Sequence, residues 1–491
     1  MALTKAAWMT RPCTSFHGRK ASSCANTLNA TKAAAMKRLR LAGFMVDVNI
    51  TWREIRQDGS AIHARISLIA ASCLANWQRW LLCSPFSMVP ASPHSPRALL
   101  HVFNRYLYRG GEELIADKIH ADLATRHDMT WCQFDSAEWT GDNAPSRLEQ
   151  AKRLFYNRDA RQSFESALDS SGAGAAVFHN VHPVGSPALY YAAMQRDLPV
   201  VQFLHNFRPF SVSGTLQVKG RLQPDALYGS YWKEVCAGAW QDSIVKSALF
   251  ALMLKALHRS GWLQSVKAWI AVSDFMRQKL VTAGALPAAR VHTLRHAWNA
   301  MSQPPAVEDV GYYLFIGRLA DTKGVIPLLD AWDALHQRLG KNTPLLHIAG
   351  AGPLNTAVQQ RLRTNPYIGQ LGHIGGETKR EALRRCRAVI VPSTWWEPLG
   401  LVVYEAYDYS KPVLAAKSGG LSEIVQHGVT GLQHEPGDVQ GIVHDVLAME
   451  ATSAAERLVM GSAGRQWLLH ETSTQAWLER FEEILAEAVS G

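Results

Sequence analysis

Two glutamates near the start of an expected helix are the residues whose spacing most clearly suggests chemistry. Glu397 and Glu405 lie eight positions apart. Eight helical residues span at most about 12 Å, which is the length of an extended diphosphate ligand with its substituents. Between the two carboxylates lie the backbone amides of Leu399, Gly400 and Leu401, which could receive a phosphate at the positive end of the helix. On spacing alone, a surface helix with two glutamates is the more common explanation.

The elements expected around these glutamates argue against an ordinary surface helix. The apolar run 388–391 predicts a buried strand that Pro392 closes. Pro398 suits the first position of a helix, where its missing N–H costs nothing, so a helix is expected over 399–407. The loop between strand and helix is apolar and aromatic, unlike a solvated face. Its Trp395 and Trp396 could stack on a sugar ring or pack in the core.

Two cations follow another expected strand. Arg318 and Lys323 come after the apolar run 312–316, in a loop bounded by Gly317 and Gly324. Cations held at a strand end can stabilise the charge that develops on a diphosphate as it leaves. Alternatively, the two residues are solvated loop cations.

The chain predicts two domains of the same class. It has 491 residues, of which 47% are hydrophobic, and this suffices for two or three domains. Strand and helix patterns alternate over 97–300 and again over 301–470, so we expect an α/β protein with two doubly wound, Rossmann-like domains facing a central cleft. A last helix over 471–491 should pack through its apolar face, which carries Trp477, Phe481, Ile484 and Leu485.

The positive charge of the chain belongs to its first 96 residues. Residues 1–96 contain 12 Lys and Arg against three Asp and Glu, and the rest contains 39 against 38. We expect this segment to be disordered or to be upstream sequence from a misplaced start; a basic arm for membrane or nucleic acid is the alternative. Seven cysteines without a C-x-x-C pair indicate a reduced, cytoplasmic protein. No secretory signal or membrane-spanning run is expected.

Several motifs, in order along 97–470, resemble those of retaining, nucleotide-sugar-dependent glycosyltransferases of family 4, of the bacterial polysaccharide type. The second half carries the strongest likeness, in Phe315–Gly324, the G-x-G-P turn at Gly350–Pro353, the E-x7-E pattern at Glu397–Glu405 and the loop Gly419–Val425. The first half fits less closely, at residues 179–189 and 200–208. Two departures are Ala351, where an acidic residue is usual, and His296, where an Asn-Gly turn is expected between the domains.

The resemblance implies the GT-B fold and a set of roles. Arg318 and Lys323 would bind the donor diphosphate, assisted by Gly111 and by the amides of Leu399, Gly400 and Leu401. Glu397 would hold hydroxyls of the donor sugar, Glu405 the ribose, and His205 would contact the sugar near its reacting carbon. The implied catalytic group is therefore Glu397, His205, Lys323 and Arg318, with no metal and no cofactor beyond the nucleotide-sugar co-substrate.

The function implied is transfer of a hexosyl group from a UDP- or GDP-sugar to a hydroxyl of a saccharide or lipid-linked saccharide, with retention of configuration. The enzyme would act in the cytoplasm, peripherally on the inner membrane face, with no nucleic-acid partner. Alternatives are a nucleotide-sugar epimerase or hydrolase of the same fold and a non-catalytic nucleotide-sugar-binding protein. A dinucleotide oxidoreductase would need G-x-G-x-x-G after its first strand, where only Gly110-Gly111 is present.

Overall fold

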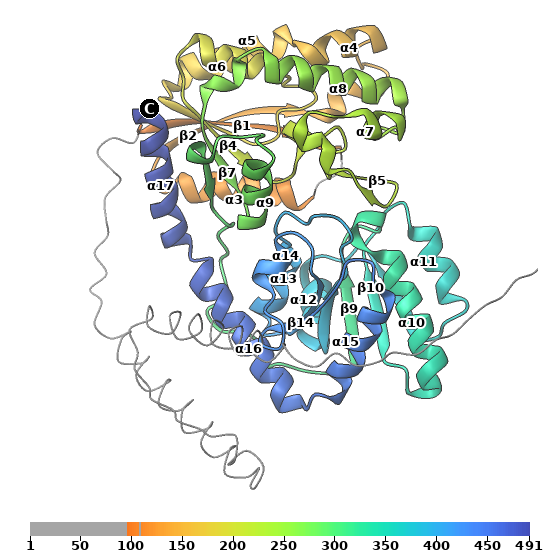
Figure 1. Cartoon of the computed structure of the whole chain (residues 1–491). Coiled ribbons are helices and arrows are strands. Elements are labelled where there is room, and N and C mark those ends of the chain that lie inside the picture. Colours follow the sequence, from red (N-terminus) through yellow and green to blue (C-terminus); the bar gives the residue numbers. More distant parts are fainter. Residues whose placement is uncertain (1–95, 108–109) are drawn as a thin grey trace, which may run out of the picture. The chain divides into compact units, whose positions relative to one another are not determined.

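A computed structural model describes residues 96–107 and 110–491 (Figure 1). The predicted extension over 1–96 therefore lies outside the described residues except for Pro96. None of the helices described is long and apolar enough to cross a membrane.

The first domain is built on a parallel six-stranded sheet in the order β2-β1-β3-β4-β7-β8. Its central strands are short apolar runs that are buried on both faces, as expected where helices cover a parallel sheet on both sides. The strands are β1 (Ala98–Arg105), β2 (Asp128–Asp135), β3 (Ala175–Phe178), β4 (Val200–Leu204), β7 (Val266–Ala271) and β8 (Val291–Thr293).

Helices cover both faces of this sheet (Figure 1). One face packs against α5 (Arg158–Ser171), α6 (Ala188–Gln195) and α8 (Ile244–Arg259). The other packs against α3 (Gly111–Leu123) and the final helix α17 (Thr474–Ser490). The remaining elements of this domain are α4 (Arg147–Phe155), α7 (Trp232–Cys236), α9 (Asp274–Thr282) and the hairpin of β5 (Gln217–Val218) and β6 (Arg221–Leu222).

The second domain repeats the architecture. Its six parallel strands lie in the order β11-β10-β9-β12-β13-β14. In both sheets the first strand lies inside and the chain winds outward in both directions, which opens a crevice at the carboxyl ends of the strands. The strands are β9 (Tyr312–Ile316), β10 (Leu345–Ala349), β11 (Ile368–Gly372), β12 (Ala388–Val391), β13 (Val413–Ala416) and β14 (Gly431–His434).

The helices of the second domain also form two layers. Apolar residues of α10 (Val325–Leu339) and α15 (Val439–Ala451) pack on one face of the sheet. Those of α12 (Gly376–Arg385), α13 (Leu401–Asp408) and α16 (Ala454–Glu471) pack on the other. Helix α11 (Asn355–Leu362) lies beside the edge strand β11, and α14 (Leu421–Ile424) is a single turn after β13.

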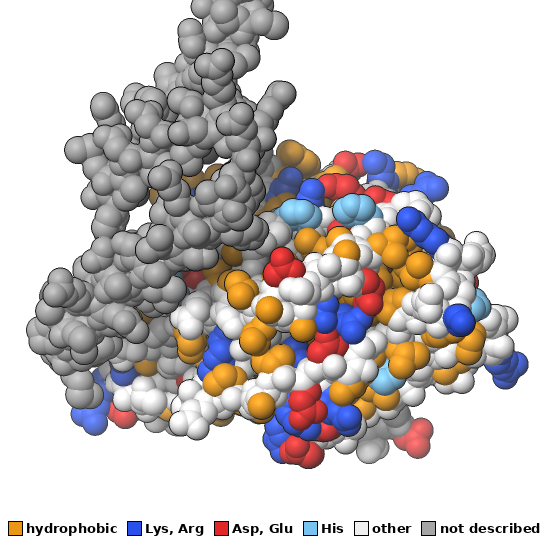
Figure 2. Space-filling view, turned by 90° about the horizontal axis from the view of Figure 1, so that it is seen from below, with side chains coloured by type: hydrophobic (Ala, Val, Ile, Leu, Met, Phe, Trp, Pro, Cys, Tyr) orange, Lys and Arg blue, Asp and Glu red, His pale blue; other side chains and the backbone are white. Residues whose placement is uncertain are grey.

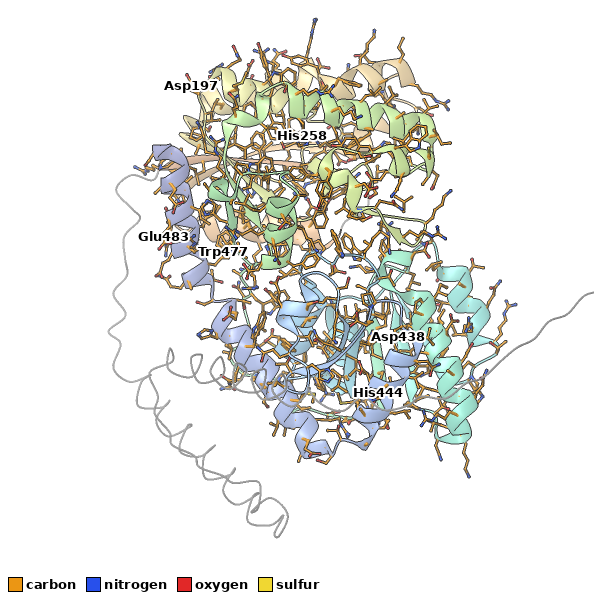
Figure 3. The ribbon with its side chains drawn as sticks, viewed as in Figure 1. Asp197, His258, Asp438, His444, Trp477 and Glu483 are labelled. Atoms are coloured by element: carbon orange, nitrogen blue, oxygen red, sulfur yellow. The ribbon has the colours of Figure 1, made fainter. Side chains whose placement is uncertain are left out.

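The predicted terminal helix packs on the first domain although it follows the second in sequence. Trp477, Phe481, Ile484 and Leu485 are buried as predicted. The ring of Trp477 stacks on Phe481, and both stack on Phe203 of β4. Trp477 lies on the buried side of α17, whereas Glu483 is exposed (Figure 3). The chain thus returns from the second domain to complete the first.

The structure corrects one helix boundary that matters for the site. We predicted that Pro398 opens a helix, but α13 begins at Leu401. Gly400 is its N-cap and has φ +100°, a conformation that side-chain-bearing residues rarely adopt. The edge strands β2, β8 and β14 were also missed, because their alternating or very short patterns lack a clear apolar run.

The surface agrees with the near-neutral charge of residues after 96. On the face seen in Figure 2, basic, acidic and apolar side chains of the described residues are interspersed. That face therefore presents no extended field of one sign, such as a nucleic-acid surface requires.

Candidate active site

Both domains contribute walls to one cavity of about 350 Å³. The first domain supplies residues from the start of α3 and from the ends of β4 and β7, and the second supplies the ends of β9 and β12 and the start of α13. Eight of the nine predicted site residues line this cavity: Gly111, His205, Lys323, Glu397, Leu399, Gly400, Leu401 and Glu405.

Three hydrogen-bond donors hold the carboxylate of Glu397 in the lining of the cavity. Lys323 Nζ lies 2.7 Å from its Oε2 and 2.9 Å from its Oε1. Ser393 Oγ (2.9 Å) and Trp395 Nε1 (2.8 Å) also donate to Oε2. The residue is only 7% exposed, and a carboxylate so buried needs such partners to stay charged. Trp395 is thus a buried donor to Glu397, and it also lines the cavity.

Glu397 is fixed by its backbone as well as by its side chain. Gly420 N donates to Glu397 O (2.7 Å). Gly419 has φ +63°, and a Cβ on it would lie 2.1 Å from the same carbonyl oxygen. Only glycine therefore lets the loop after β13 approach the loop that carries Glu397 so closely.

The loop with Lys323 is tied to the loop with Glu397. Thr394 N donates to Thr322 O (3.0 Å), and Thr394 Oγ1 donates to Asp321 O (2.8 Å). The amide of Gln217, in the β5–β6 hairpin of the first domain, donates to the same hydroxyl (3.1 Å). The cation and the carboxylate are therefore positioned together, although 74 residues separate them.

The start of α13 lies between the two glutamates. Val403 N bonds to Gly400 O (2.9 Å), so the first helical amides, those of Leu401 and Val402, have no carbonyl of their own helix to bond. Such amides favour an anion through both hydrogen bonding and the helix dipole. One turn further on, Glu405 lines the cavity and pairs with Lys379 Nζ (2.6 Å).

Arg318 is the predicted site residue that does not line the cavity. Its side chain is exposed, and among the described residues no ion pair or side-chain hydrogen bond holds it. A bound anion would have to draw it in. Its role remains a prediction.

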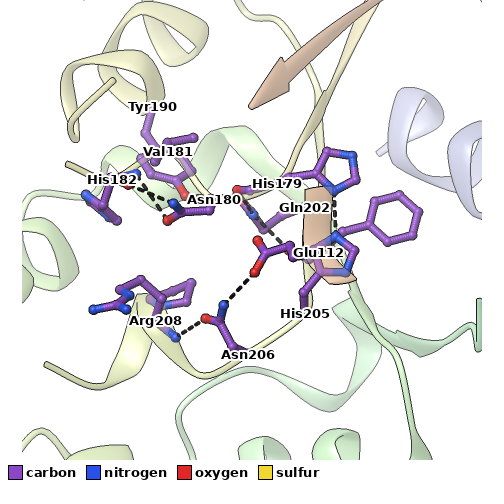
Figure 4. A pocket seen from close by; sticks show the side chains of 12 residues that line it. Glu112, His179, Asn180, Val181, His182, Tyr190, Gln202, His205, Asn206 and Arg208 are labelled. Atoms are coloured by element: carbon purple, nitrogen blue, oxygen red, sulfur yellow. Dashed lines mark hydrogen bonds between the residues drawn. The ribbon is translucent and has the colours of Figure 1, made fainter. Parts of the chain in front are cut away.

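His205 lies in the cavity wall but has no free ring nitrogen. Its Nε2 is 2.6 Å from His179 Nδ1 (Figure 4). Its Nδ1 is 3.3 Å from His296 Nε2. Burial lowers the pKa of His205 to about 3, so the ring is neutral. A hydrogen bond from its nitrogens to a donor sugar would require one of these two bonds to open.

A polar cluster that sequence reasoning missed surrounds Glu112 at the start of α3. Asn206 Nδ2 donates to Glu112 Oε2 at 2.8 Å (Figure 4). Tyr106 Oη donates to the same oxygen, also at 2.8 Å. Burial raises the pKa of Glu112 to about 7, although these two hydrogen bonds oppose the rise. A carboxyl group that titrates near neutrality in a cleft is a candidate for substrate contact. Its position straight after Gly110-Gly111 was the available signal.

His296 is the second cavity residue that the sequence-based site prediction omitted. The sequence marked it only as a departure in the linker between the domains, but it is 4% exposed and lines the cavity. Its Nδ1 is buried and has no partner among the residues described. This unpartnered nitrogen could not be recognised from the pattern around residue 296.

Glu423 joins the two domains beside the cavity. Its carboxylate accepts the backbone N–H of Asp274 (3.1 Å) and of Phe275 at the start of α9 in the first domain. Arg295 Nη2 donates to Glu423 (2.9 Å) and to Asp274 (3.0 Å). The ion pairs and the helix start together hold the second domain against the first.

Over residues 96–107 and 110–491, no group of three or more His, Cys, Asp or Glu side chains could hold a metal ion. The cavity itself presents a cation paired with a buried carboxylate, a helix start, a second carboxylate and neutral histidines.

Comparison with known proteins agrees with this layout. Residues 297–467 match the family model described as "Glycosyl transferases group 1". Two structures superimpose over 79% of this chain and 98% of their own: the HepE protein of Anabaena in complex with UDP (TM-score 0.55, 15% identity) and sucrose-phosphate synthase from Thermosynechococcus elongatus (TM-score 0.56, 16% identity). The fold is GT-B. The predicted fold class is thereby confirmed, and the cavity lies in the cleft of the GT-B fold.

The curated relatives align with smaller parts of this chain than these two structures do. An uncharacterized glycosyltransferase of Methanocaldococcus jannaschii is 25% identical over 44% of this chain and 62% of its own length. O-antigen chain mannosyltransferase B of Escherichia coli is 28% identical over 40% and 54%. The chain thus spans less than two thirds of these relatives. The alpha-maltose-1-phosphate synthase of Mycobacterium tuberculosis is 27% identical over 63% of this chain and 79% of its own.

Proposed function

We propose that the protein is a retaining glycosyltransferase of family 4, which transfers a hexosyl group from a UDP- or GDP-sugar to a hydroxyl of a saccharide or lipid-linked saccharide. One observation carries the proposal. The Lys323–Glu397 pair, the first amides of α13 and Glu405 lie along one wall of a single cleft cavity. Their order suits the sugar, the diphosphate and the ribose of one extended ligand.

The diphosphate would lie against Lys323 and the start of α13. Among the described residues, Lys323 Nζ forms an ion pair with Glu397 alone, and it lies over the ring of Trp395 (5.3 Å to the centroid). A bound phosphate would share this cation, and Arg318 would swing in from solvent. Gly111, on the facing wall, would present the backbone of α3 to the phosphates; its nearest neighbour across the cavity is the Leu401 side chain, 3.4 Å from the position of an added Cβ.

In the reaction, the bond between the sugar anomeric carbon and the phosphate oxygen breaks, and its electron pair stays on that oxygen. The acceptor hydroxyl attacks the same face of the sugar and passes its proton to the leaving oxygen as the new bond forms. Lys323 and the helix amides stabilise the charge on the diphosphate. Glu397 orients the donor hydroxyls, and Glu405 the ribose. The same-face course accounts for the proposed retention.

Names of related proteins support a sugar-transfer function. The relatives above include a mannosyltransferase and a maltose-1-phosphate synthase, and HepE was crystallised with UDP. Epimerase or hydrolase activity has no such support among the relatives compared here.

A membrane-bound acceptor fits one surface of the first domain. Five large apolar side chains on or beside α7 and α8 are more than half exposed: Tyr228, Trp232, Ile244, Val245 and Leu252. We propose that this surface contacts the membrane that holds a lipid-linked acceptor. Co-sedimentation with anionic vesicles should be lost in the Trp232→Ser/Val245→Ser double variant. Equal sedimentation of both proteins would refute the membrane contact.

The activity is tested with a panel of UDP- and GDP-sugars. One donor should be consumed slowly alone and faster with a saccharide acceptor, and the anomeric configuration of the product, read by NMR, tests retention. Tight nucleotide binding without turnover for any donor would favour the binding-protein alternative. Release of free sugar that no acceptor can intercept would favour the hydrolase.

A further inference from the structure

Five histidines form a continuous hydrogen-bonded chain through the first domain. His120 Nδ1 lies 3.1 Å from His101 Nδ1, and His101 Nε2 bonds to His179 Nε2. His179 Nδ1 lies 2.6 Å from His205 Nε2, and His205 Nδ1 lies 3.3 Å from His296 Nε2. Each of the three inner rings therefore uses both of its nitrogens on other histidines.

The sheet order explains why these residues meet. His101 is on β1, His179 follows β3 and His205 follows β4, and these three strands are neighbours in the sheet. His120 comes from α3, which packs on the same face. His296 comes from the linker that leaves the domain. The chain thus runs across the sheet from a helix to the cleft.

The surroundings of the chain are mainly aromatic. The indole of Trp131 stacks on both His101 and His120 at 4.2 Å, with planes within 9° and 7°, and so holds the two rings for an in-plane hydrogen bond. Phe203 stacks on His179 and His205. The charged groups that act on the rings from neighbouring elements are Asp117 at His120 and Lys118 at His296, both on α3.

Burial keeps all five rings neutral. It lowers the pKa of His101, His179 and His296 well below the usual value and that of His205 to about 3, and it lowers the pKa of His120 less. A neutral imidazole has one N–H and one bare nitrogen. Each ring can then donate to one neighbour and accept from the other, so an unbroken chain has only two possible orientations.

The two ends differ in a way that selects one orientation. His120 is half-buried, whereas His296 is 4% exposed and its Nδ1 has no partner among the described residues. If all N–H groups point toward His296, a buried N–H is left unpaired, which is the rarer situation in proteins. If all point toward His120, the surplus N–H lies at the outer end and His296 presents a bare Nδ1 at the cavity.

We propose that this chain of His296, His205, His179, His101 and His120 is a proton relay between the cleft and the protein surface. The proposal rests on the glycosyl transfer proposed above, which releases one proton for each bond formed. It gives His296 a role as the proton acceptor in the cleft and the other four histidines a role in conduction. His205 then acts through its neighbours as well as through its place in the wall.

Protons balance over one turn of the proposed relay. The acceptor hydroxyl gives its proton to the leaving phosphate oxygen, which passes it to His296 Nδ1. His296 then passes its Nε2 proton to His205 Nδ1, each ring hands on its own proton in turn, and His120 releases one from Nε2 to solvent. When the products leave, water in the open cleft removes the Nδ1 proton of His296, and His120 regains one. No ring keeps a net charge.

The orientation of the chain has a direct readout that does not depend on activity. In the protein labelled with ¹⁵N-histidine, long-range ¹H–¹⁵N spectra distinguish the two neutral tautomers. The free protein at pH 7.5 should carry its proton on Nε2 at residues 120, 179, 205 and 296 and on Nδ1 at residue 101. A broken order along these five residues, or a protonated ring among the three inner ones, would overturn the relay.

The kinetic test uses a residue that keeps hydrogen bonds but cannot pass a proton. His101→Gln supplies one donor and one acceptor, yet an amide does not exchange its proton from one end to the other. The single-turnover rate of transfer should fall at least tenfold with an unchanged melting temperature. His182→Gln is the matched control, because His182 is also fully buried but neither of its ring nitrogens has a partner.

A second variant tests the outer end. His120→Ala should slow single turnover, and 50 mM imidazole should restore most of the rate in this variant but not in His101→Gln. Equal rates for His101→Gln and the wild type would refute the relay while leaving glycosyl transfer intact. Absence of transfer by the wild type with every donor would instead refute the proposed function, and the tautomer order would then decide the relay alone.

Discussion

Lys323 gives the sharpest test of the proposed donor site, because its ion pair with Glu397 and the catalytic role proposed for it predict effects of different size. Its Nζ is 2.7 Å from Glu397 Oε2, and its side chain is 30% exposed. A hydrogen bond to a charged group contributes about 1.5–3 kcal/mol, and the remaining exposure places this one near the lower bound. Lys323→Ala should therefore cost about 1.5 kcal/mol of stability and lower the melting temperature by about 3 °C.

The expected kinetic loss is larger. Removal of one preorganised group that stabilises developing charge costs about 2.7–4 kcal/mol of transition-state stabilisation. Because Lys323 is shared with Glu397, we expect the lower figure, which is a fall in kcat of about 100-fold. The assay is nucleotide release at saturating donor and acceptor, with the melting temperature recorded on the same preparations.

Arg361 provides the control. It is 27% exposed, and its Nη2 lies 2.7 Å from Asp330, on α10 and away from the cavity. Arg361→Ala should lower the melting temperature by a similar amount and leave kcat unchanged. If Lys323→Ala keeps kcat within threefold of the wild type while its melting temperature falls, the pair is structural and the donor site has been misplaced.

Three further predictions concern backbone fit and pH. Gly419→Ala should lower the free energy of unfolding in urea by more than about 2 kcal/mol, because its Cβ meets Glu397 O. Gly428 has a similar φ but open space around it, so Gly428→Ala should lower the free energy of unfolding by only about 1 kcal/mol. Equal losses in the two variants would refute the close fit at Gly419. Glu112 has a pKa raised to about 7, so its folded-state cost appears as pH rises from 4.5 to 7. The stability of Glu112→Gln relative to the wild type should rise by about 3 kcal/mol between pH 4.5 and 8, and a constant difference would contradict this. Because the pKa of His205 is lowered in the folded protein, this ring binds a proton near pH 6 only when the protein is unfolded. The free energy of unfolding should therefore fall below pH 6.5 by about 1.4 kcal/mol per pH unit for each such histidine. Equal urea midpoints at pH 7.5 and pH 5 would contradict this prediction.

The donor side of the cleft could be predicted because its information is local. A buried strand, a short loop and a helix bring Glu397 and Glu405 together within nine residues, and the strand runs of the second domain are apolar and bounded by turns. The helix start was misjudged by three residues, since the preference of proline for the first turn was outweighed by the left-handed conformation of Gly400.

The rest of the site is made by tertiary structure. His101 and His296 lie 195 positions apart, and only the order β1-β3-β4 in the sheet and the path of the linker join them through His179 and His205. Single histidines in separate segments give no periodic or motif signal. The raised pKa of Glu112 likewise depends on its burial beside residues that precede it and that lie far beyond it in sequence.

The position of helix α17 in the sequence has a consequence for folding during synthesis. Its Trp477, Phe481 and Leu485 belong to the same apolar core as Leu99 and Phe203 of the first sheet. A ribosome makes the strands of the first domain early but makes this covering helix only after the whole second domain. Residues 312–434, which contain all six strands of the second sheet, are contiguous and need no such wait. Until α17 is made, this face of the first sheet is covered by α3 alone, so aggregation at that stage would depend on residues 474–490 rather than on the second domain.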